Sequence, residues 1–143
     1  DGHQGWSARG AFVQPPGPAH PAHRRLPLAS YVYHSESAAS FGDTLVWAGS
    51  KGAAFIDADR WYCVEQHIKL NTPGKADGVL RAWVDGKPAF ERRNLRLRDT
   101  PALRVENIWM NVYLGGSKTA LRDMSLMVDH VVVATRYIGP MPP

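Results

Sequence analysis

Short segments rich in Val, Ile, Tyr and Trp, separated by turn-forming residues, place the strongest constraint on how this chain folds. They lie at 61–70, 79–84, 108–114 and 124–138. These residue types favour strands, and the Gly, Pro, Asn and Asp residues between the segments favour turns. No segment shows sustained helical periodicity. Closely spaced strands of this kind predict an all-β antiparallel sandwich or jelly roll, and "VDGKPAF" predicts a hairpin with Asp85 and Gly86 at its tip.

Length and charge narrow the class of protein. A chain of 143 residues is expected to form a single domain over 1–143 with its own core. Its 17 basic and 13 acidic residues give a net charge of +4, which suits a polyanionic partner without requiring one. One cysteine excludes an internal disulfide and a cysteine-rich metal site. No apolar stretch approaches the roughly 18 residues of a membrane-spanning helix, so we expect no membrane partner.

A proline-rich segment interrupts the strand pattern at 14–29. It contains five prolines, which cannot donate to a strand ladder, so it is expected to be a surface loop inserted into the domain. The loop is either disordered or forms a basic lip beside a groove, with His20, His23, Arg24 and Arg25.

The segments on either side of this loop carry four polar residues with matching spacing. Side chains two residues apart share one face of a strand, so Ser7 and Arg9 lie on one face, as do Tyr31 and Tyr33. If the two strands are neighbours, these four side chains line one patch, with Val32 on the opposite face. The alternative is an ordinary solvated sheet face.

The same alternation divides two later segments. In 61–70 it predicts that Val64, Ile68 and Leu70 are buried and that Glu65, His67 and Lys69 share the other face. In 108–114 it predicts four buried apolar side chains and an opposite face of amides and aromatic rings. The buried set is Ile108, Met110, Val112 and Leu114, and the other is Asn107, Trp109, Asn111 and Tyr113. Rings that stack on sugars and amides that bond hydroxyls suit a carbohydrate groove, although a plain outer face fits equally well.

Ser-x-Arg followed by Tyr-x-Tyr resembles the active-site pattern of polysaccharide lyase family fourteen, the alginate and polyglucuronate lyases. "WYCVEQHIKLNTPGKADGVLRAWVDG" resembles the core shared by that family and the related glucuronan lyases, and "IWMNVYLGG" and "MVDHVVVATRYIGP" resemble their last strands. The resemblance implies a concanavalin-like β-jelly roll, a secreted protein and β-elimination on an acidic polysaccharide. It also implies that Tyr31 and Tyr33 are the catalytic pair, and that Ser7 and Arg9 position and neutralise the substrate carboxylate.

The chain departs from the family pattern in two ways. The family places a substrate-binding lysine upstream of Ser-x-Arg, whereas the first lysine here is Lys51, and it joins the two motifs more tightly. The domain is therefore expected to be incomplete at its N-terminus, with a missing segment or a second chain completing the sandwich, because unpaired strand edges and exposed apolar surface are usually avoided.

Elimination on a uronate needs the carboxylate neutralised before the neighbouring carbon loses its proton. An arginine does this with a bidentate grip and stays charged at any working pH. A tyrosine has an ordinary pKa of about 10, so acting as a base near pH 7 requires roughly 4 kcal/mol of stabilisation of the phenolate. A nearby cation lowers the pKa of a phenol, so we expect Arg9 to supply much of this. Either tyrosine is a candidate for the base.

Further candidate substrate-binding residues are His34, His67, Lys69, Trp109, Asn111 and Tyr113. Alternation points His34 away from the patch unless the strand ends there, and His67 is also a candidate base. No cofactor is expected to be required; Asp129 resembles a position where some glucuronan-lyase-like proteins bind structural calcium, so metal stays open.

Other functions fit the sequence less well than the lyase does. A glycoside hydrolase needs two carboxylates flanking one bond, and Glu65 is the only acid centred in a predicted strand. The basic segment "ERRNLRLR" at 91–98 lacks an aromatic stacking platform, so no nucleic-acid partner is expected. The stronger alternative is a non-catalytic carbohydrate-binding protein of the same fold.

Overall fold

A computed structural model of the chain describes residues 4–13, 25–37, 40–49, 52–115, 123 and 125–140. The chain divides into two compact units. The first comprises Asp1–Arg104 together with Tyr137–Pro143, and the second comprises Val105–Arg136. Each unit is described by itself below.

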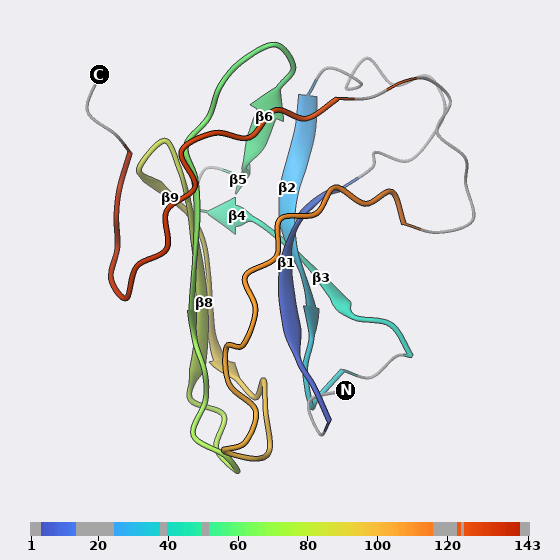
Figure 1. Cartoon of the computed structure of the whole chain (residues 1–143), viewed down its shortest axis with the longest axis vertical. Helices are drawn as coiled ribbons and strands as arrows, with labels where there is room; N and C mark the ends of the chain where they lie inside the picture. Colours follow the sequence, from blue (N-terminus) through green and yellow to red (C-terminus); the bar gives the residue numbers. More distant parts are fainter. Residues whose placement is uncertain are drawn as a thin grey trace. The chain divides into compact units, whose positions relative to one another are not determined.

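The first sheet of the larger unit is antiparallel and is built around β2 (Figure 1). Its strands are β1 (Ser7–Phe12), β2 (Arg25–Tyr33), β3 (Asp43–Val46) and β6 (Phe55–Asp57). β1 lies along one side of β2, while β3 and β6 also pair with β2. β4 (Ala48–Gly49) and β5 (Gly52–Ala53) form a separate two-stranded ladder.

The second sheet contains β7 (Val64–Lys69), β8 (Gly78–Val84) and β9 (Lys87–Leu95), in that order. Asp85 and Gly86 connect β8 to β9 and have φ angles of 49° and 72°. Two consecutive positive φ angles belong to the turn that matches the twist of a tight hairpin, and Asp-Gly is a preferred pair for it. The hairpin predicted at this position is confirmed.

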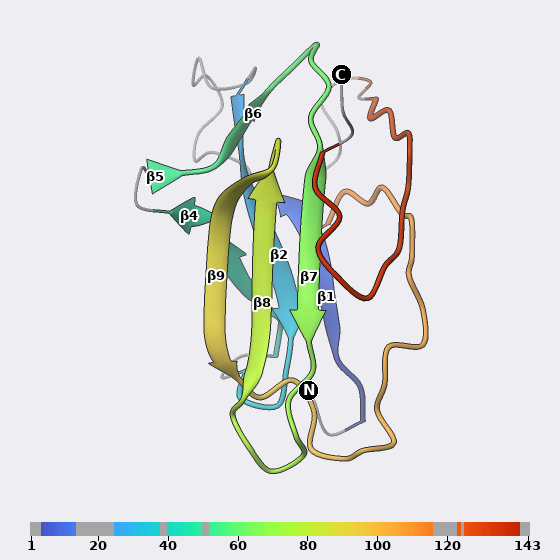
Figure 2. The same cartoon turned by 90° about the vertical axis from the view of Figure 1, so that its left-hand side faces the viewer.

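The two sheets face each other, as the perpendicular views show (Figures 1 and 2). Buried apolar side chains from both sheets meet between them in two clusters. One contains Leu28, Trp47, Ala82 and Ala89, and the other contains Val32, Leu80, Leu95 and Leu97. Burying a side chain of Leu or Val size stabilises the fold by roughly 1.5–3 kcal/mol, so the inner faces hold the sheets together.

A buried polar chain also links the sheets. The indole Nε1–H of Trp47 donates to the hydroxyl of Ser30 over 2.8 Å, and that hydroxyl donates to Oε1 of Gln66 on β7 over 2.7 Å. Each polar group in this hydrogen-bonded chain therefore has the partner that a buried polar group needs. The bond from Ser30 to Gln66 shows that even residues of β2 turn toward the second sheet, so odd residues near them face outward.

Two details of the predicted strands are corrected. β2 begins at Arg25, so the last five residues of the loop predicted at 14–29 are strand, and Pro27 pairs with Phe55. Proline is tolerated near the start of a strand, where fewer ladder bonds depend on its missing N–H. Val64 was predicted to be buried but is 49% exposed, because it is the first residue of an edge strand. The proposed basic lip lies outside the described residues, except for the backbone of Arg25.

The strands predicted at 108–114 and 124–138 are wrong for the residues that the structure describes there. No ladder bond is formed in those stretches. Residues predicted to be buried are exposed: Ile108 (60%), Met110 (57%), Val112 (71%) and Leu114 (50%). Alternation predicts which residues would share a face, but a strand also needs a neighbour to pair with, and none pairs with these stretches among the described residues.

The described residues thus form an all-β structure with antiparallel sheets. None of them belongs to a helix that is long and apolar enough to cross a membrane.

Candidate active site

Strand pairing brings the two polar motifs together. β1 and β2 are antiparallel neighbours, with Ser7 opposite Tyr33 and Arg9 opposite Tyr31. Residues directly opposite in an antiparallel pair lie on the same face, and Val32 between the tyrosines is fully buried on the other face. The two strands are therefore neighbours, which was the condition for a shared patch, and the four side chains share the outer face of the first sheet. We call these four residues the Arg9–tyrosine patch.

The Arg9 guanidinium lies beside both aromatic rings, at nearly the same distance from each. Its Cζ atom is 5.5 Å from the ring centre of Tyr31 and 5.4 Å from that of Tyr33. The two rings meet edge to face, with centres 5.4 Å apart and planes at 90°. A cation within about 6 Å of an aromatic ring is attracted to its face, so the rings hold the guanidinium in place while leaving its N–H groups available.

The two phenols and one backbone amide form a short hydrogen-bonded chain. The Tyr31 and Tyr33 hydroxyl oxygens are 3.4 Å apart, and the N–H of Gly42 donates to the Tyr31 oxygen over 3.0 Å. An amide N–H only donates, so the Tyr31 oxygen accepts on that side, and either phenol can donate in the contact between the two hydroxyls.

The pKa of Tyr31 is raised above its ordinary value of 10.0. The hydrogen bond to Tyr33 contributes most to the increase, and loss of solvent contributes next. The Gly42 amide and the Arg9 charge both lower the pKa of Tyr31, but they are outweighed. For Tyr31 the expectation that Arg9 supplies a low pKa is therefore wrong, because the hydrogen bond with Tyr33 and the loss of solvent favour the protonated phenol.

Ser7 contributes an unused hydroxyl to the patch. Its Oγ atom is buried and has no hydrogen-bond partner among the described residues. A buried polar atom without a partner is uncommon, and a serine hydroxyl can both donate and accept. The serine is thus able to bond a group that enters beside Tyr33.

His34 lies on the opposite side of the same sheet. Its Nε2 atom is 2.6 Å from the Asp43 carboxylate, and its Nδ1 atom accepts the N–H of Glu36 over 3.3 Å. The side chain is buried, as expected from regular alternation beyond Tyr33. The structure therefore places His34 with Asp43 and apart from the Arg9–tyrosine patch.

His67 and Lys69 lie on the outer face of the second sheet, because their neighbours Gln66 and Ile68 face the core. His67 is opposite Arg81 in the register of β7 and β8. The sandwich core separates this face from the Arg9–tyrosine patch. Neither residue reaches the two phenols, although the predicted grouping of His67 and Lys69 with Glu65 agrees with the register.

Three predicted sugar-binding residues belong to the smaller unit. Trp109, Asn111 and Tyr113 are exposed there on backbone that forms no ladder, with Trp109 75% and Tyr113 73% exposed. Asp129 is in the same unit, where its carboxylate contacts the backbone N–H and the Nδ1 atom of His130. Within the described part of the chain, no three His, Cys, Asp or Glu side chains are grouped to hold a metal ion.

The residues invoked for other functions have partners within the fold. Both carboxylate oxygens of Glu65 accept backbone N–H groups, from Ile138 and Gly139, each over 3.0 Å. In the basic segment, Arg96 pairs with Asp99, and Arg98 donates to the carbonyl oxygens of Asn71 and Leu103. These contacts give Glu65, Arg96 and Arg98 structural roles within the fold.

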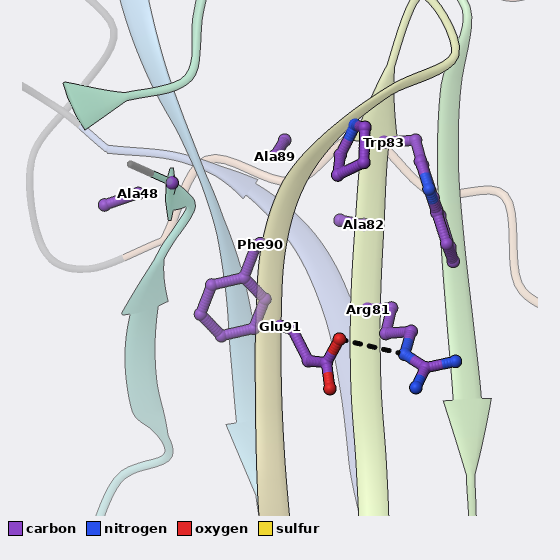
Figure 3. A pocket seen from close by; sticks show the side chains of 9 residues that line it. Ala48, Arg81, Ala82, Trp83, Ala89, Phe90 and Glu91 are labelled. Atoms are coloured by element: carbon purple, nitrogen blue, oxygen red, sulfur yellow. Dashed lines mark hydrogen bonds and ion pairs between the residues drawn. The ribbon is translucent and has the colours of Figure 1, made fainter. Parts of the chain in front are cut away.

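A hollow of about 430 Å³ lies elsewhere, beside β9 (Figure 3). Ala48 and Gly49 line it together with residues of β8 and β9, and Arg81 is bonded to Glu91 at its side. None of the four patch residues lines this hollow.

Comparison with known proteins gives one match. The family model described as Polysaccharide lyase 14 matches residues 29–125, which is more than half of the chain. The matched range includes Tyr31, Tyr33 and Gly42, whereas Ser7 and Arg9 precede it. No curated protein and no solved structure matches the chain.

Proposed function

The chain belongs to the polysaccharide lyase 14 family, and from this membership we propose that it cleaves a 4-linked polyuronate, alginate or glucuronan, by β-elimination. The observation that carries the proposal is the position of Arg9, with its guanidinium within 5.5 Å of both phenol rings on one sheet face. The proposal also includes two properties that the resemblance implies, a jelly-roll fold and an extracellular location.

The reaction requires three functions that the patch residues can supply. Arg9 binds the uronate carboxylate through parallel N–H···O bonds, which makes the adjacent carbon more acidic. Ser7 bonds the same carboxylate or a neighbouring hydroxyl. A base removes the proton from carbon 5, the electron pair forms the double bond between carbons 4 and 5, and the bond from carbon 4 to the glycosidic oxygen breaks. An acid gives that oxygen its proton.

The two tyrosines divide the acid and base roles according to their surroundings. The raised pKa of Tyr31 keeps its proton in place near neutral pH, which suits a proton donor. Tyr33 is then the base, with the Tyr31 hydroxyl 3.4 Å from its own and the Arg9 guanidinium beside its ring. As the base withdraws the proton from carbon 5, Tyr31 protonates the departing oxygen.

The alternative is a protein of the same fold that binds the polysaccharide without cleaving it. Such a protein would also use Arg9 to bind the carboxylate, so the geometry of the patch is compatible with both cleavage and binding. The separating property is the new double bond, which absorbs ultraviolet light and is produced only by elimination.

The test is incubation with polymannuronate, polyguluronate and polyglucuronate while ultraviolet absorbance of the unsaturated uronate is recorded. We expect absorbance to grow on at least one polymer and Tyr33→Phe to lower kcat by about 10²–10⁴-fold, the usual contribution of a general base. Tyr137→Phe is the matched control, because within the described part of the chain its hydroxyl donates to the Gly86 carbonyl oxygen, at 3.4 Å, and to no group of the Arg9–tyrosine patch. Binding of all three polymers without absorbance would establish the non-catalytic alternative.

A further inference from the structure

Gly42 contacts the tyrosine pair through its backbone. It directly precedes β3, and its N–H donates to the Tyr31 hydroxyl oxygen over 3.0 Å. Sequence analysis gave no reason to single it out, since a glycine before a strand usually marks a turn. Here, however, the amide donates its hydrogen bond to a side chain of the neighbouring strand.

Close approach, and not backbone conformation, is what requires a glycine at this position. Gly42 is absent from the residues with positive φ, so an L-residue could adopt its backbone angles. A Cβ atom at residue 42 would lie 2.8 Å from the carbonyl oxygen of Val32 and 3.2 Å from Cε1 of Tyr31. Contacts this short would push the strand start away from β2. By contrast, a Cβ added to Gly10 on β1 meets nothing within 4 Å.

We propose that Gly42 is a positioning residue for the reaction: its amide directs the Tyr31 proton toward Tyr33, and its missing side chain sets the distance at which it does so. The proposal deepens the proposed function and rests on it.

Donor and acceptor counting favours one direction. A phenol oxygen carries one proton, and the Gly42 N–H already occupies part of its accepting side. Among the described residues, the other hydrogen-bonding neighbour of this oxygen is the Tyr33 hydroxyl at 3.4 Å, and either hydroxyl can donate in that contact. In the proposed arrangement the chain runs from the Gly42 N–H to the Tyr31 oxygen, and from the Tyr31 O–H to the Tyr33 oxygen. Without the amide, Tyr31 would accept a proton from Tyr33 more readily, which would leave the base without its donor.

The amide also acts on the charged form of Tyr31. A hydrogen bond donated to a phenolate stabilises it, and the Gly42 N–H accordingly lowers the pKa of Tyr31. Losing this bond raises the pKa of Tyr31 further. Because Tyr31 donates its proton, it works below its pKa, so the alkaline limb of the pH–rate profile should move to higher pH.

The experiment compares Gly42→Ala with Gly10→Ala. For Gly42→Ala we expect kcat to fall about tenfold with KM nearly unchanged, the size of one hydrogen bond to a charged group. We also expect the alkaline limb and the titration of the Tyr31 ring carbon, followed by NMR, to move to higher pH. Gly10→Ala should leave the rate, the limb and the titration in place. A purely structural role for Gly42 would lower the folded fraction without moving the limb.

Two further measurements keep the proposal open to refutation. In a Tyr31→Phe background, Gly42→Ala should no longer shift the pH profile, since the affected phenol is gone. If Gly42→Ala does not fold, the Gly42 amide resonance of the native protein should still shift on Tyr31→Phe substitution, as expected for loss of a hydrogen bond. An amide resonance unchanged by Tyr31→Phe, or a Tyr31 titration unchanged by Gly42→Ala, overturns the proposal. Both NMR measurements apply even if no polyuronate is cleaved, so failure of the proposed function is distinguishable.

Discussion

The outer faces of the two sheets contain similar residue types, but their arginines differ in whether a carboxylate pairs with them. On the first sheet, Arg9 contacts two phenol rings, and no described carboxylate pairs with it. On the second sheet, Arg81 bonds Glu91 over 3.2 Å, and Glu91 also pairs with Arg93. The first face offers an arginine without a described carboxylate partner, whereas on the second face Arg81 and Arg93 share the Glu91 carboxylate.

The second face is also covered by the end of the larger unit. The ring of Tyr137 packs on Trp83 with centres 4.9 Å apart, and Glu65 binds the backbone just after Tyr137. Strand residues on this outer face therefore bind the segment of the same chain at residues 137–139. Two faces with the same alternation differ because Arg81, Glu91 and Glu65 on the second face have partners within the fold, although the buried Nδ1 atom of His67 there has none among the described residues.

This difference favours the first face as the site of chemistry. Recruiting a paired arginine to bind a substrate carboxylate requires breaking the existing pair, whereas Arg9 gains a partner without losing one. Substitutions on the first face should consequently affect catalysis more than stability, and those on the second face should do the reverse.

The largest expected effect is that of Arg9→Ala. Removing the guanidinium leaves the substrate carboxylate without its neutralising charge, so we expect kcat to fall by about 10²–10³-fold, as for loss of a transition-state donor. The midpoint of urea unfolding should barely change, because Arg9 is exposed and makes no described ion pair. Arg9→Lys keeps the charge without the planar fork and should be intermediate. An unchanged elimination rate in Arg9→Ala would show that the carboxylate is bound elsewhere.

Local sequence patterns predicted which side chains of each motif share a face, whereas the pairing of the two strands entered only as a condition. The alternation in Ser-x-Arg and Tyr-x-Tyr predicted that the two residues of each motif share a face. Asp-Gly predicted the turn at Asp85 because this type of hairpin turn requires positive φ angles, which these residues readily adopt. The role of Gly42 could not be predicted, since it depends on the register between β2 and β3. The direction of the Tyr31 pKa was also missed, because a neighbouring charge is visible in the sequence and a hydrogen bond between two phenols is not.

The wrong strand predictions have a related cause. Val, Ile and aromatic residues at 108–114 and 124–138 state a preference for pairing, but the sequence does not say which strand is available as a neighbour. Helix hydrogen bonds are local and strand hydrogen bonds are not. Predictions from alternation are therefore strongest where a turn fixes the partner, as in β8 and β9, and weakest where the partner is distant.

The next effect in size is on stability and comes from Glu65→Gln. A glutamine offers one carbonyl oxygen and one NH₂ group, so one of the two backbone N–H groups would face a donor. We expect a loss of about 1–2 kcal/mol in the free energy of unfolding, measured with urea. Hydrogen exchange at the Ile138 and Gly139 amides should become faster. The elimination rate per folded molecule should be unchanged, and a large loss of that rate would assign Glu65 to the reaction.

The smallest effect is expected for Arg81→Ala, which is the matched counterpart of Arg9→Ala on the second face. The side chains of Arg81 and Glu91 are 36% and 39% exposed, and pairs of this kind contribute about 0–1 kcal/mol. Glu91 keeps Arg93 as a partner after the substitution, which reduces the loss further. We therefore expect near-native unfolding and a near-native elimination rate. If Arg81→Ala slowed elimination as much as Arg9→Ala, compensation by a neighbouring carboxylate would not distinguish the two faces, and the polymer would have to contact both sheets.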